Sequence, residues 1–309
     1  MRLTLTRRKL FKSALVVGSV GKLLAGENKT FKLGIITDEL TGQLEEALPF
    51  LSGYQLHWCE LREMWGKNIM NLSQEELDRA KKLLAKHDLA VSDIASPIFK
   101  WNLPQMPAKE EKRDVYKASF VEEDANRLLE ESFKLARFFG TRQVRIFSYW
   151  RVEHPEKTYA MVRDRLAQAA KVAAKNDMVL VLENEHACNI GTGKEMGPLL
   201  KEINSPGLRG NWDPGNAAML DEVPYPDGYR AVKGFFSHVH IKDVRKNAAG
   251  KKEWAPVGGG YIDWKGQMQA LRKDGYQGTM SLETHYLRPD RNKVESTRES
   301  LEGLLKILG

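Results

Sequence analysis

The sequence predicts one α/β domain folded as a (β/α)8 TIM barrel. Strand-like and helix-like segments alternate eight times over about 280 residues, and repeated βα units build a parallel sheet that closes at eight strands. The chain has 309 residues, of which 42% are hydrophobic and 29% charged, as is ordinary for a soluble globular protein. Polar residues gather where the later strands end, which is where barrels of this kind carry their chemistry.

The first half of the chain contains four of the expected strands. Ser73 and Glu76 form a capping box at one helix start, and Gly140 ends another helix as a C-cap. The loop 97–117 is long for a compact domain, which favours a functional or covering role. In order, the elements are strand 31–37, helix 43–51, strand 54–62, helix 73–87, strand 89–96, helix 120–139 and strand 143–148.

The second half repeats the pattern. Pro155 occupies the first turn of its helix, where a missing N–H is tolerated. A short, interrupted helical region precedes residue 235, and a glycine-rich loop spans 257–261. In order, the elements are helix 155–176, strand 179–183, helix 194–203, strand 208–213, strand 235–243, helix 264–273, strand 278–283 and helix 292–308.

The seventh strand has an unusual pattern of side chains. His238, His240 and Lys242 share one parity, and Val239 and Ile241 share the other. Successive side chains of a strand point to opposite faces, so both histidines and the lysine are expected on one face. A polar inward face is typical of a barrel strand that reaches a site, although two histidines bonded within the core would give the same pattern.

Three other strands end in a carboxylate: Glu183, Asp213 and Glu283. With His240, their spacings are 213 − 183 = 30, 240 − 213 = 27 and 283 − 240 = 43 residues, each about one βα unit. All four residues are therefore expected at the same mouth of the barrel. Three carboxylates and an imidazole form a ligand set for a hard or borderline metal ion.

Five short motifs, in order, resemble the xylose isomerase-like TIM-barrel superfamily, the sugar phosphate isomerase/epimerase group. The resemblance runs from about residue 31 to the C-terminus. The motifs are Val181-Leu182-Glu183-Asn184, Asn211-Trp212-Asp213-Pro214-Gly215-Asn216, His238-Val239-His240-Ile241-Lys242-Asp243, Gly258-Gly259-Gly260-Tyr261-Ile262-Asp263-Trp264, and Gly275-Tyr276-Gln277-Gly278 leading into Ser281-Leu282-Glu283.

The resemblance implies one divalent metal ion held by Glu183, Asp213, His240 and Glu283. Mn²⁺ or Mg²⁺ fits this carboxylate-rich set best, and Zn²⁺ or Co²⁺ is the alternative. In epimerases of the group the first and last glutamates act on opposite faces of the substrate. One removes a proton next to a carbonyl and the other returns one, while the metal stabilises the enediolate. Glu183 and Glu283 are therefore the expected catalytic pair.

Several positions depart from the epimerase pattern. Asn216 replaces a histidine of some members, Lys246 replaces an arginine of ketose epimerases, and Asn189 replaces a second glutamate. Because the corresponding residues touch substrate in those relatives, the departures leave the sugar and the reaction open. The residues expected to bind substrate are His186, Asn216, Lys242, Lys246, Trp101 and Arg145.

Each of these residues also has a structural interpretation. His186 would be a solvated loop histidine, and Lys242 would pair with a neighbouring acid. Arg145 would form a buried ion pair with Glu60 inside the barrel. Trp101, like Trp254, would pack within a loop at the barrel mouth instead of stacking on a sugar.

Three functional classes are compatible with the sequence. The first is a divalent-metal-dependent isomerase or epimerase of an unphosphorylated sugar or keto-sugar. The second is a lyase or dehydratase that acts on a keto-sugar or oxidised glycoside on the same scaffold. The third is a non-catalytic exported carbohydrate-binding protein, which would not need two opposed carboxylates. DNA-repair endonucleases of the superfamily use three zinc ions and more histidines, and this chain has seven histidines and none at position 216.

The first 26 residues are predicted to be a twin-arginine export signal, and residues 27–309 to form the barrel. Arg7 and Arg8 precede a modestly apolar run that ends near Ala25. The run is too short and too rich in glycine and serine for a stable membrane span. The mature protein is therefore expected in the periplasm or secreted, the alternative being a basic stub on a cytoplasmic protein.

The charge of the chain is concentrated in that leader. The net charge is +7, and the first 26 residues hold six basic and no acidic residues, so 7 − 6 = +1 remains. A nearly neutral domain argues against nucleic acid as a partner. The expected partner is a small carbohydrate, and homo-oligomerisation is left open. Two cysteines, Cys59 and Cys188, indicate no disulfide framework.

Overall fold

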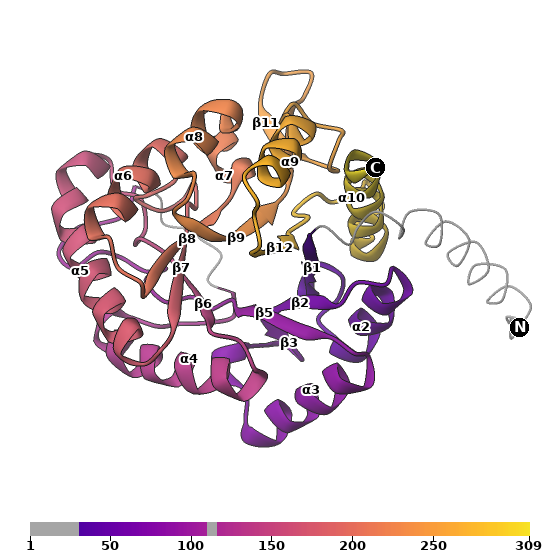
Figure 1. The fold of residues 1–309 in the computed structure, drawn as a ribbon, viewed down its shortest axis with the longest axis horizontal. Coiled ribbons are helices and arrows are strands. Elements are labelled where there is room, and N and C mark those ends of the chain that lie inside the picture. Colours follow the sequence, from indigo (N-terminus) through magenta and orange to yellow (C-terminus); the bar gives the residue numbers. More distant parts are fainter. Residues whose placement is uncertain (1–30, 110–115) are drawn as a thin grey trace, which may run out of the picture.

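The computed structural model describes residues 31–109 and 116–309, which form a closed barrel of eight parallel strands ringed by helices (Figure 1). The predicted fold is confirmed, whereas the predicted export signal lies outside the described residues. The barrel strands are β1 (Lys32–Ile36), β2 (Trp58–Leu61), β5 (Ala90–Ile94), β6 (Gln143–Ile146), β7 (Val179–Glu183), β8 (Leu208–Trp212), β9 (Phe236–Ile241) and β12 (Thr279–Leu282). Neighbours follow the order β1, β12, β9, β8, β7, β6, β5 and β2, and β2 pairs with β1.

The helices lie outside the strands and begin close to the predicted positions. Ser73 and Glu76 form the expected capping box, and Gly140 ends its helix with a φ of 79°. The helix predicted from residue 120 begins at Ala125, because Glu122–Asp124 form a 3-10 turn. The helices are α2 (Leu44–Gly53), α3 (Gln74–Lys86), α4 (Ala125–Phe139), α5 (Pro155–Lys175), α6 (Gly193–Ile203), α7 (Pro214–Met219), α8 (Tyr229–Val232), α9 (Trp264–Lys273) and α10 (Lys293–Leu308).

The barrel strands are buried on both faces, as parallel strands covered by helices must be. In β7, Leu180 and Leu182 belong to the apolar layer that packs under the helices. Glu183 has the opposite parity and is fully buried inside the barrel. The core therefore has an apolar outer layer and a polar interior, which places charged side chains in a site that excludes water.

Two antiparallel hairpins were not predicted. One is formed by β3 (Glu63–Met64) and β4 (Lys67–Asn68), and the other by β10 (Asp243–Lys246) and β11 (Lys252–Ala255). The predicted seventh strand, 235–243, is three residues shorter than expected: it begins at Phe236 and ends at Ile241, since Asp243 begins the second hairpin. Asp243 also accepts backbone N–H groups of Gly258 and Gly260, at 2.9 and 3.1 Å, which fixes the glycine-rich loop beside the hairpin.

Among the residues described, no helix is both long and apolar enough to cross a bilayer. Cys59 and Cys188 are buried free thiols, which agrees with the expected lack of a disulfide framework.

Candidate metal and catalytic site

The four predicted metal ligands converge at the C-terminal ends of neighbouring strands. Glu183 ends β7, His240 lies near the end of β9, and Asp213 and Glu283 directly follow β8 and β12. All four are fully buried, and one ligand atom from each lies within 4.8 Å of the others. Three carboxylates and one imidazole this close together fit a divalent ion such as Mn²⁺ or Mg²⁺, and the imidazole also suits Zn²⁺.

His240 turns one ring nitrogen toward the three acids. Its Nδ1 atom lies 3.1 Å from Glu283 Oε2, 3.6 Å from Glu183 Oε1 and 3.7 Å from Asp213 Oδ2. This buried nitrogen makes no hydrogen bond within the described residues, although leaving a buried polar atom unpaired is costly. The geometry therefore fits a nitrogen placed for a metal ion.

Each of the two glutamates predicted to be catalytic is paired with an arginine through its outer oxygen. Arg62 Nη1 lies 2.7 Å from Glu283 Oε1, and Arg145 Nη1 lies 3.4 Å from Glu183 Oε2. The other oxygen of each glutamate faces the centre of the site. On this side Glu183 Oε1 accepts a hydrogen bond from Asn216 Nδ2 at 3.0 Å.

Both glutamates are held in the ionised form. Burial raises the pKa of Glu183, but the positive charges of His240 and Arg145 together outweigh it, and the net pKa lies below its usual value. Burial also raises the pKa of Glu283, yet Lys242 and His240 together hold it well below its usual value. A carboxylate must be ionised to accept a proton, so this state suits both residues to act as bases.

Lys242 places its ammonium group among the acids. Nζ lies 2.6 Å from Glu283 Oε2 and 2.9 Å from Asp213 Oδ2, and the side chain is fully buried. Burial lowers the pKa of Lys242, but these two carboxylates raise it well above its usual value. Of the two interpretations given by the sequence, the structure shows the pairing with neighbouring acids.

Asn216 and His186 extend the polar network toward the barrel mouth. Asn216 donates to Asp213 Oδ2 at 3.0 Å, and its Oδ1 lies 2.8 Å from His186 Nδ1. Glu185 Oε1 lies 2.9 Å from the same nitrogen. Burial lowers the pKa of His186, but Glu185 outweighs this effect and raises it. Glu185 thus favours the protonated form of His186, which contacts the ligand candidates through Asn216.

Trp254 forms a wall of the site. From the sequence it was expected only to lie on a loop at the barrel mouth. Its ring lies 5.9 Å from that of His186, 5.3 Å from that of His285 and 5.1 Å from Lys242 Nζ. It comes from β11, so the unpredicted hairpin brings it there. The tryptophan itself was visible in the sequence, but its position depends on a hairpin with no strong turn signal.

Arg62 was not identified from the sequence as a site residue. Besides Glu283, it bonds Asp38 at 2.8 Å and Glu39 at 2.6 Å. Its position two residues beyond Glu60, with the same parity, was the signal that could have identified it. The expected ion pair of Arg145 with Glu60 is present, with 3.7 Å between Arg145 Nη1 and Glu60 Oε1.

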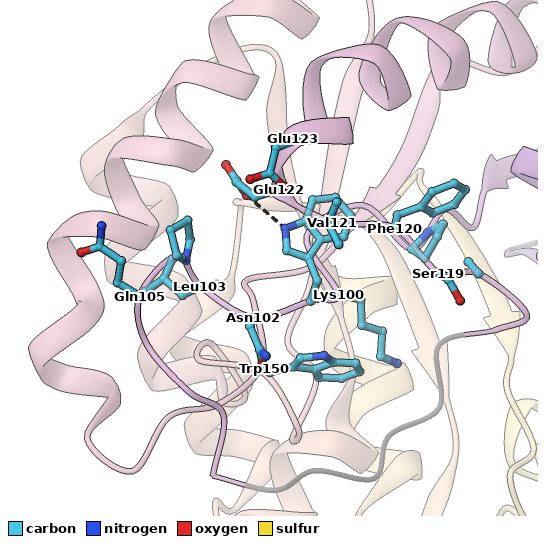
Figure 2. A pocket seen from close by; sticks show the side chains of 14 residues that line it. Lys100, Asn102, Leu103, Gln105, Ser119, Phe120, Val121, Glu122, Glu123 and Trp150 are labelled. Atoms are coloured by element: carbon cyan, nitrogen blue, oxygen red, sulfur yellow. Dashed lines mark hydrogen bonds between the residues drawn. The ribbon is translucent and has the colours of Figure 1, made fainter.

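Trp101 lies at a separate pocket on the barrel rim. Its indole N–H donates to Glu122 Oε2 at 3.0 Å, the dashed line in Figure 2, and its ring packs edge-on against Tyr149. The pocket has a volume of about 450 Å³, and Trp150, Phe120 and the stem of Lys100 also line it. The structure thus places Trp101 outside the four-ligand group.

Lys246 also lies apart from the ligand group. It is exposed on β10 and lines a cavity of about 700 Å³ together with Asp221 and Tyr261. The structure therefore brings His186, Asn216, Lys242 and Arg145 to the ligands, and leaves Trp101 and Lys246 on the surrounding rim.

Comparison with known proteins shows the same architecture. The family model described as "Xylose isomerase-like TIM barrel" matches residues 52–307. No curated protein matches the sequence. A xylose isomerase-like TIM barrel/4-hydroxyphenylpyruvate dioxygenase fusion protein aligns with a TM-score of 0.68 at 18% identity. That alignment covers 90% of this chain and 42% of the fusion protein, so the chain spans less than half of that relative.

Two further solved structures match over nearly their whole length. One is the probable 3-DHS dehydratase AsbF from Bacillus anthracis, at 18% identity and a TM-score of 0.65, covering 85% of this chain and 97% of that one. The other is the 3-keto-D-glucoside 4-epimerase YcjR from E. coli, also at 18% identity, with a TM-score of 0.63 and coverage of 89% and 99%. At these identities the likeness establishes the fold alone.

Proposed function

The chain belongs to the xylose isomerase-like TIM barrel family, and on this premise we propose that it is a divalent-metal-dependent isomerase or epimerase of an unphosphorylated sugar or keto-sugar. The observation that carries the proposal is the pair Glu183 and Glu283. Both are buried and ionised, they come from different strands, and each presents one oxygen to the same centre. Binding alone does not require two such acids.

The metal would be held by Glu183, Asp213, His240 and Glu283. A divalent ion there supplies a Lewis acid that stabilises negative charge on a carbonyl oxygen. Asn216 restrains two of the ligands, since its amide donates to both Glu183 and Asp213 at 3.0 Å. These hydrogen bonds keep the carboxylate oxygens aimed at one point before a substrate arrives, which is the preorganisation that such catalysis needs.

The proton transfers are assigned to the two glutamates. The ionised carboxylate of one glutamate accepts the proton from the carbon next to the carbonyl. The other glutamate takes a proton from solvent and donates it to the opposite face of the substrate, and the first then returns its proton to solvent. Arg62 and Arg145 stay paired with the outer oxygens and help to keep the reacting oxygens in place. Acid–base assistance of this kind contributes about 10²–10⁴-fold.

The charge balance of the site supports an unphosphorylated substrate. Arg62, Arg145 and Lys242 are buried cations, and each is already paired with carboxylates inside the barrel. A phosphate group would have to displace these pairs or lie beside the acids, and both are costly in a buried site. Hydroxyl and carbonyl groups carry no such cost.

The test is to incubate metal-loaded protein with free sugars, keto-sugars and oxidised glycosides in D₂O and follow them by NMR. Deuterium at the carbon next to a carbonyl, with formation of an isomer, is expected. Glu183→Gln and Glu283→Gln should each lose most turnover, while the exposed Glu46→Gln keeps it. If both glutamine variants stayed active on the true substrate, the paired-carboxylate mechanism would be wrong.

A lyase or dehydratase is the second candidate, and the pocket beside Trp101 favours it. This pocket adjoins the site, because Lys100 lines it and Nζ lies 3.8 Å from Glu185 Oε2. Aromatic walls suit the substituent of a glycoside, which a lyase would expel after the same proton abstraction. Release of that substituent in the NMR experiment, without an isomer, would identify the lyase.

We also propose export through the twin-arginine pathway to the periplasm or the medium, on the basis of Arg7 and Arg8 before an apolar run. Replacing both arginines by lysine should leave the protein in the cytoplasm, as judged by fractionation and immunoblotting. Export of the doubly substituted protein would show that the leader has another role.

A further inference from the structure

Glu60 is a buried carboxylate without a role in the proton transfers described above. It belongs to β2, on the far side of the barrel from the metal ligands of β7 and β8, and none of its surface is exposed. Its Oε2 atom lies 3.1 Å from His240 Nε2 and 3.1 Å from His238 Nε2. Both histidines of the seventh predicted strand thus converge on one carboxylate.

The contact between Glu60 and His240 decides which ring nitrogen of His240 is available to a metal ion. A carboxylate accepts hydrogen bonds, so Glu60 favours the tautomer that carries its proton on Nε2. When a metal ion takes the place of the other ring proton, Nδ1 is the nitrogen that offers its lone pair, and it faces Glu183, Asp213 and Glu283 without a hydrogen bond of its own among the described residues. A carboxylate behind a ligating histidine also makes the imidazole a stronger donor.

Asn211 is compatible with this tautomer. Its amide Nδ2 lies 3.0 Å from His240 Nε2, and its Oδ1 is buried without a hydrogen-bond partner in the described residues. The two ends of an amide have nearly the same shape, so a half-turn of the group places the oxygen beside the N–H. The oxygen then gains a donor, and the NH₂ group takes the position in which the oxygen had no partner.

Glu60 also touches the support of a second ligand. Arg145 Nη1 lies 3.7 Å from Glu60 Oε1 and 3.4 Å from Glu183 Oε2. The arginine therefore lies between the two carboxylates, and its position depends on both. Glu60 therefore contacts one ligand candidate directly, His240, and it also contacts Arg145, which is paired with a second one, Glu183.

We propose that Glu60 is a positioning residue of the metal site, which sets the ring orientation and tautomer of His240 and steadies Glu183 through Arg145. The inference rests on the proposed function, since it requires a divalent ion at the four ligands. The specific claim is that Glu60 raises the affinity of the site for the ion although Glu60 does not bind the ion itself.

The test measures Mn²⁺ binding by electron paramagnetic resonance in wild type and in Glu60→Gln. Glutamine keeps the shape, but it lacks the charge and can turn an NH₂ group toward the imidazole. The expected result is a 10–100-fold loss of affinity, the range typical for partners of ligating histidines. Circular dichroism and the melting temperature of the metal-free proteins show whether the variant folds.

Asp93→Asn is the matched control. Asp93 is equally buried in the same network, and its Oδ1 lies 3.7 Å from His238 Nε2, but among the described residues it forms no hydrogen bond or ion pair with a ligand candidate. Its Mn²⁺ affinity should stay within about twofold of wild type. An equal loss in both variants would mean that the buried charge matters and not the contact with His240, which would overturn the proposal.

The outcomes separate the two proposals. Tight Mn²⁺ binding by wild type and an unchanged affinity in folded Glu60→Gln would reject the role of Glu60 and leave the metal site intact. Failure of folded wild type to bind Mn²⁺, Mg²⁺, Zn²⁺ or Co²⁺ would reject the metal site, and the role of Glu60 with it.

Discussion

At the residue scale, Lys242 balances charge that a divalent ion would otherwise balance. Its ammonium pairs with Asp213 and Glu283, both ligand candidates. Removing one partner of a buried ion pair typically costs about 3–5 kcal/mol, because the remaining charge is left uncompensated. The ammonium and the ion therefore stabilise the same acids.

Lys242→Met is accordingly expected to lower the melting temperature strongly in the presence of a chelator and much less with saturating Mn²⁺. Differential scanning calorimetry under both conditions provides the measurement. The control is Lys233→Met, which breaks an exposed pair with Asp274 and should cost less than about 1 kcal/mol in either condition. An equal loss of melting temperature with and without Mn²⁺ would show that the ammonium and the ion do not stabilise the same carboxylates.

We predict that Asp93 lowers the stability of the folded protein as the pH rises, whereas a carboxylate in an ordinary ion pair raises it. Burial and the neighbouring Glu60 raise the pKa of Asp93 to about 6. The folded state therefore binds this proton more tightly than the unfolded state, and stability falls as the pH rises from about 4 to 6. Above that range the penalty is fully present.

Asp93→Asn should thus stabilise the protein at pH 7.5, by at most about 3 kcal/mol for a two-unit shift, and have little effect near pH 4. Urea unfolding at both pH values measures the difference. A stabilisation of equal size at both would mean that ionisation of Asp93 is not its cause.

The convergence of the four ligand candidates could be predicted from the sequence because each lies at the end of a recognisable strand at a spacing of about one βα unit. Arg62 and Glu39 could not, since their roles depend on how β1 and β2 face the last strand. Glu39 lies in the 3-10 turn Thr37–Glu39, and its bond to Arg62 joins segments with no shared sequence signal. Contacts across the barrel axis follow from closure and register, which local patterns do not contain.

At the scale of elements, the helices were more predictable than the hairpins. Helix α3 has a capping box and an apolar stripe, both of which are local signals. The strands of the β10–β11 hairpin have four residues each and alternate only weakly, so the sequence favoured a loop. This hairpin nevertheless carries Trp254 to the site.

Trp254→Ala should lower kcat/KM by up to roughly 30-fold, because the ring covers Lys242 and a desolvated cation over an indole is worth about 2 kcal/mol. Trp254→Phe should keep most of the activity, since an aromatic face remains. Steady-state kinetics on the substrate found by NMR provides the measurement.

Trp65→Ala is the matched control, since this tryptophan lies at the turn of the other hairpin and packs on Arg79. Its catalytic constants should be unchanged. Equal losses of kcat/KM in the two alanine variants would mean that hairpin stability, and not the cover that Trp254 gives the site, causes the effect.

At the scale of the whole molecule, metal binding and folding should be coupled. The three carboxylate ligands and His240 come from four strands, so an ion held by all four binds the closed barrel and not the unfolded chain. A ligand at 100 times its dissociation constant adds about 2.7 kcal/mol of stability.

Chelation should therefore lower the melting temperature of wild type, and adding back Mn²⁺ should restore it. Asp213→Ala should show no such shift, because it lacks a ligand. Differential scanning fluorimetry measures both proteins. A full Mn²⁺ shift in Asp213→Ala would contradict the proposed ligand set.

Closure of the barrel also determines when the site can first exist. Strand β12 pairs with β1, and Glu283 bonds Arg62 across 221 residues of chain. While the ribosome is still making the last unit, the nascent barrel has an open edge at β1 and at β9, and it lacks one ligand. An ion held by all four ligand candidates would thus bind only after β12 is made, and a chain truncated before β12 would lack both the closed barrel and Glu283.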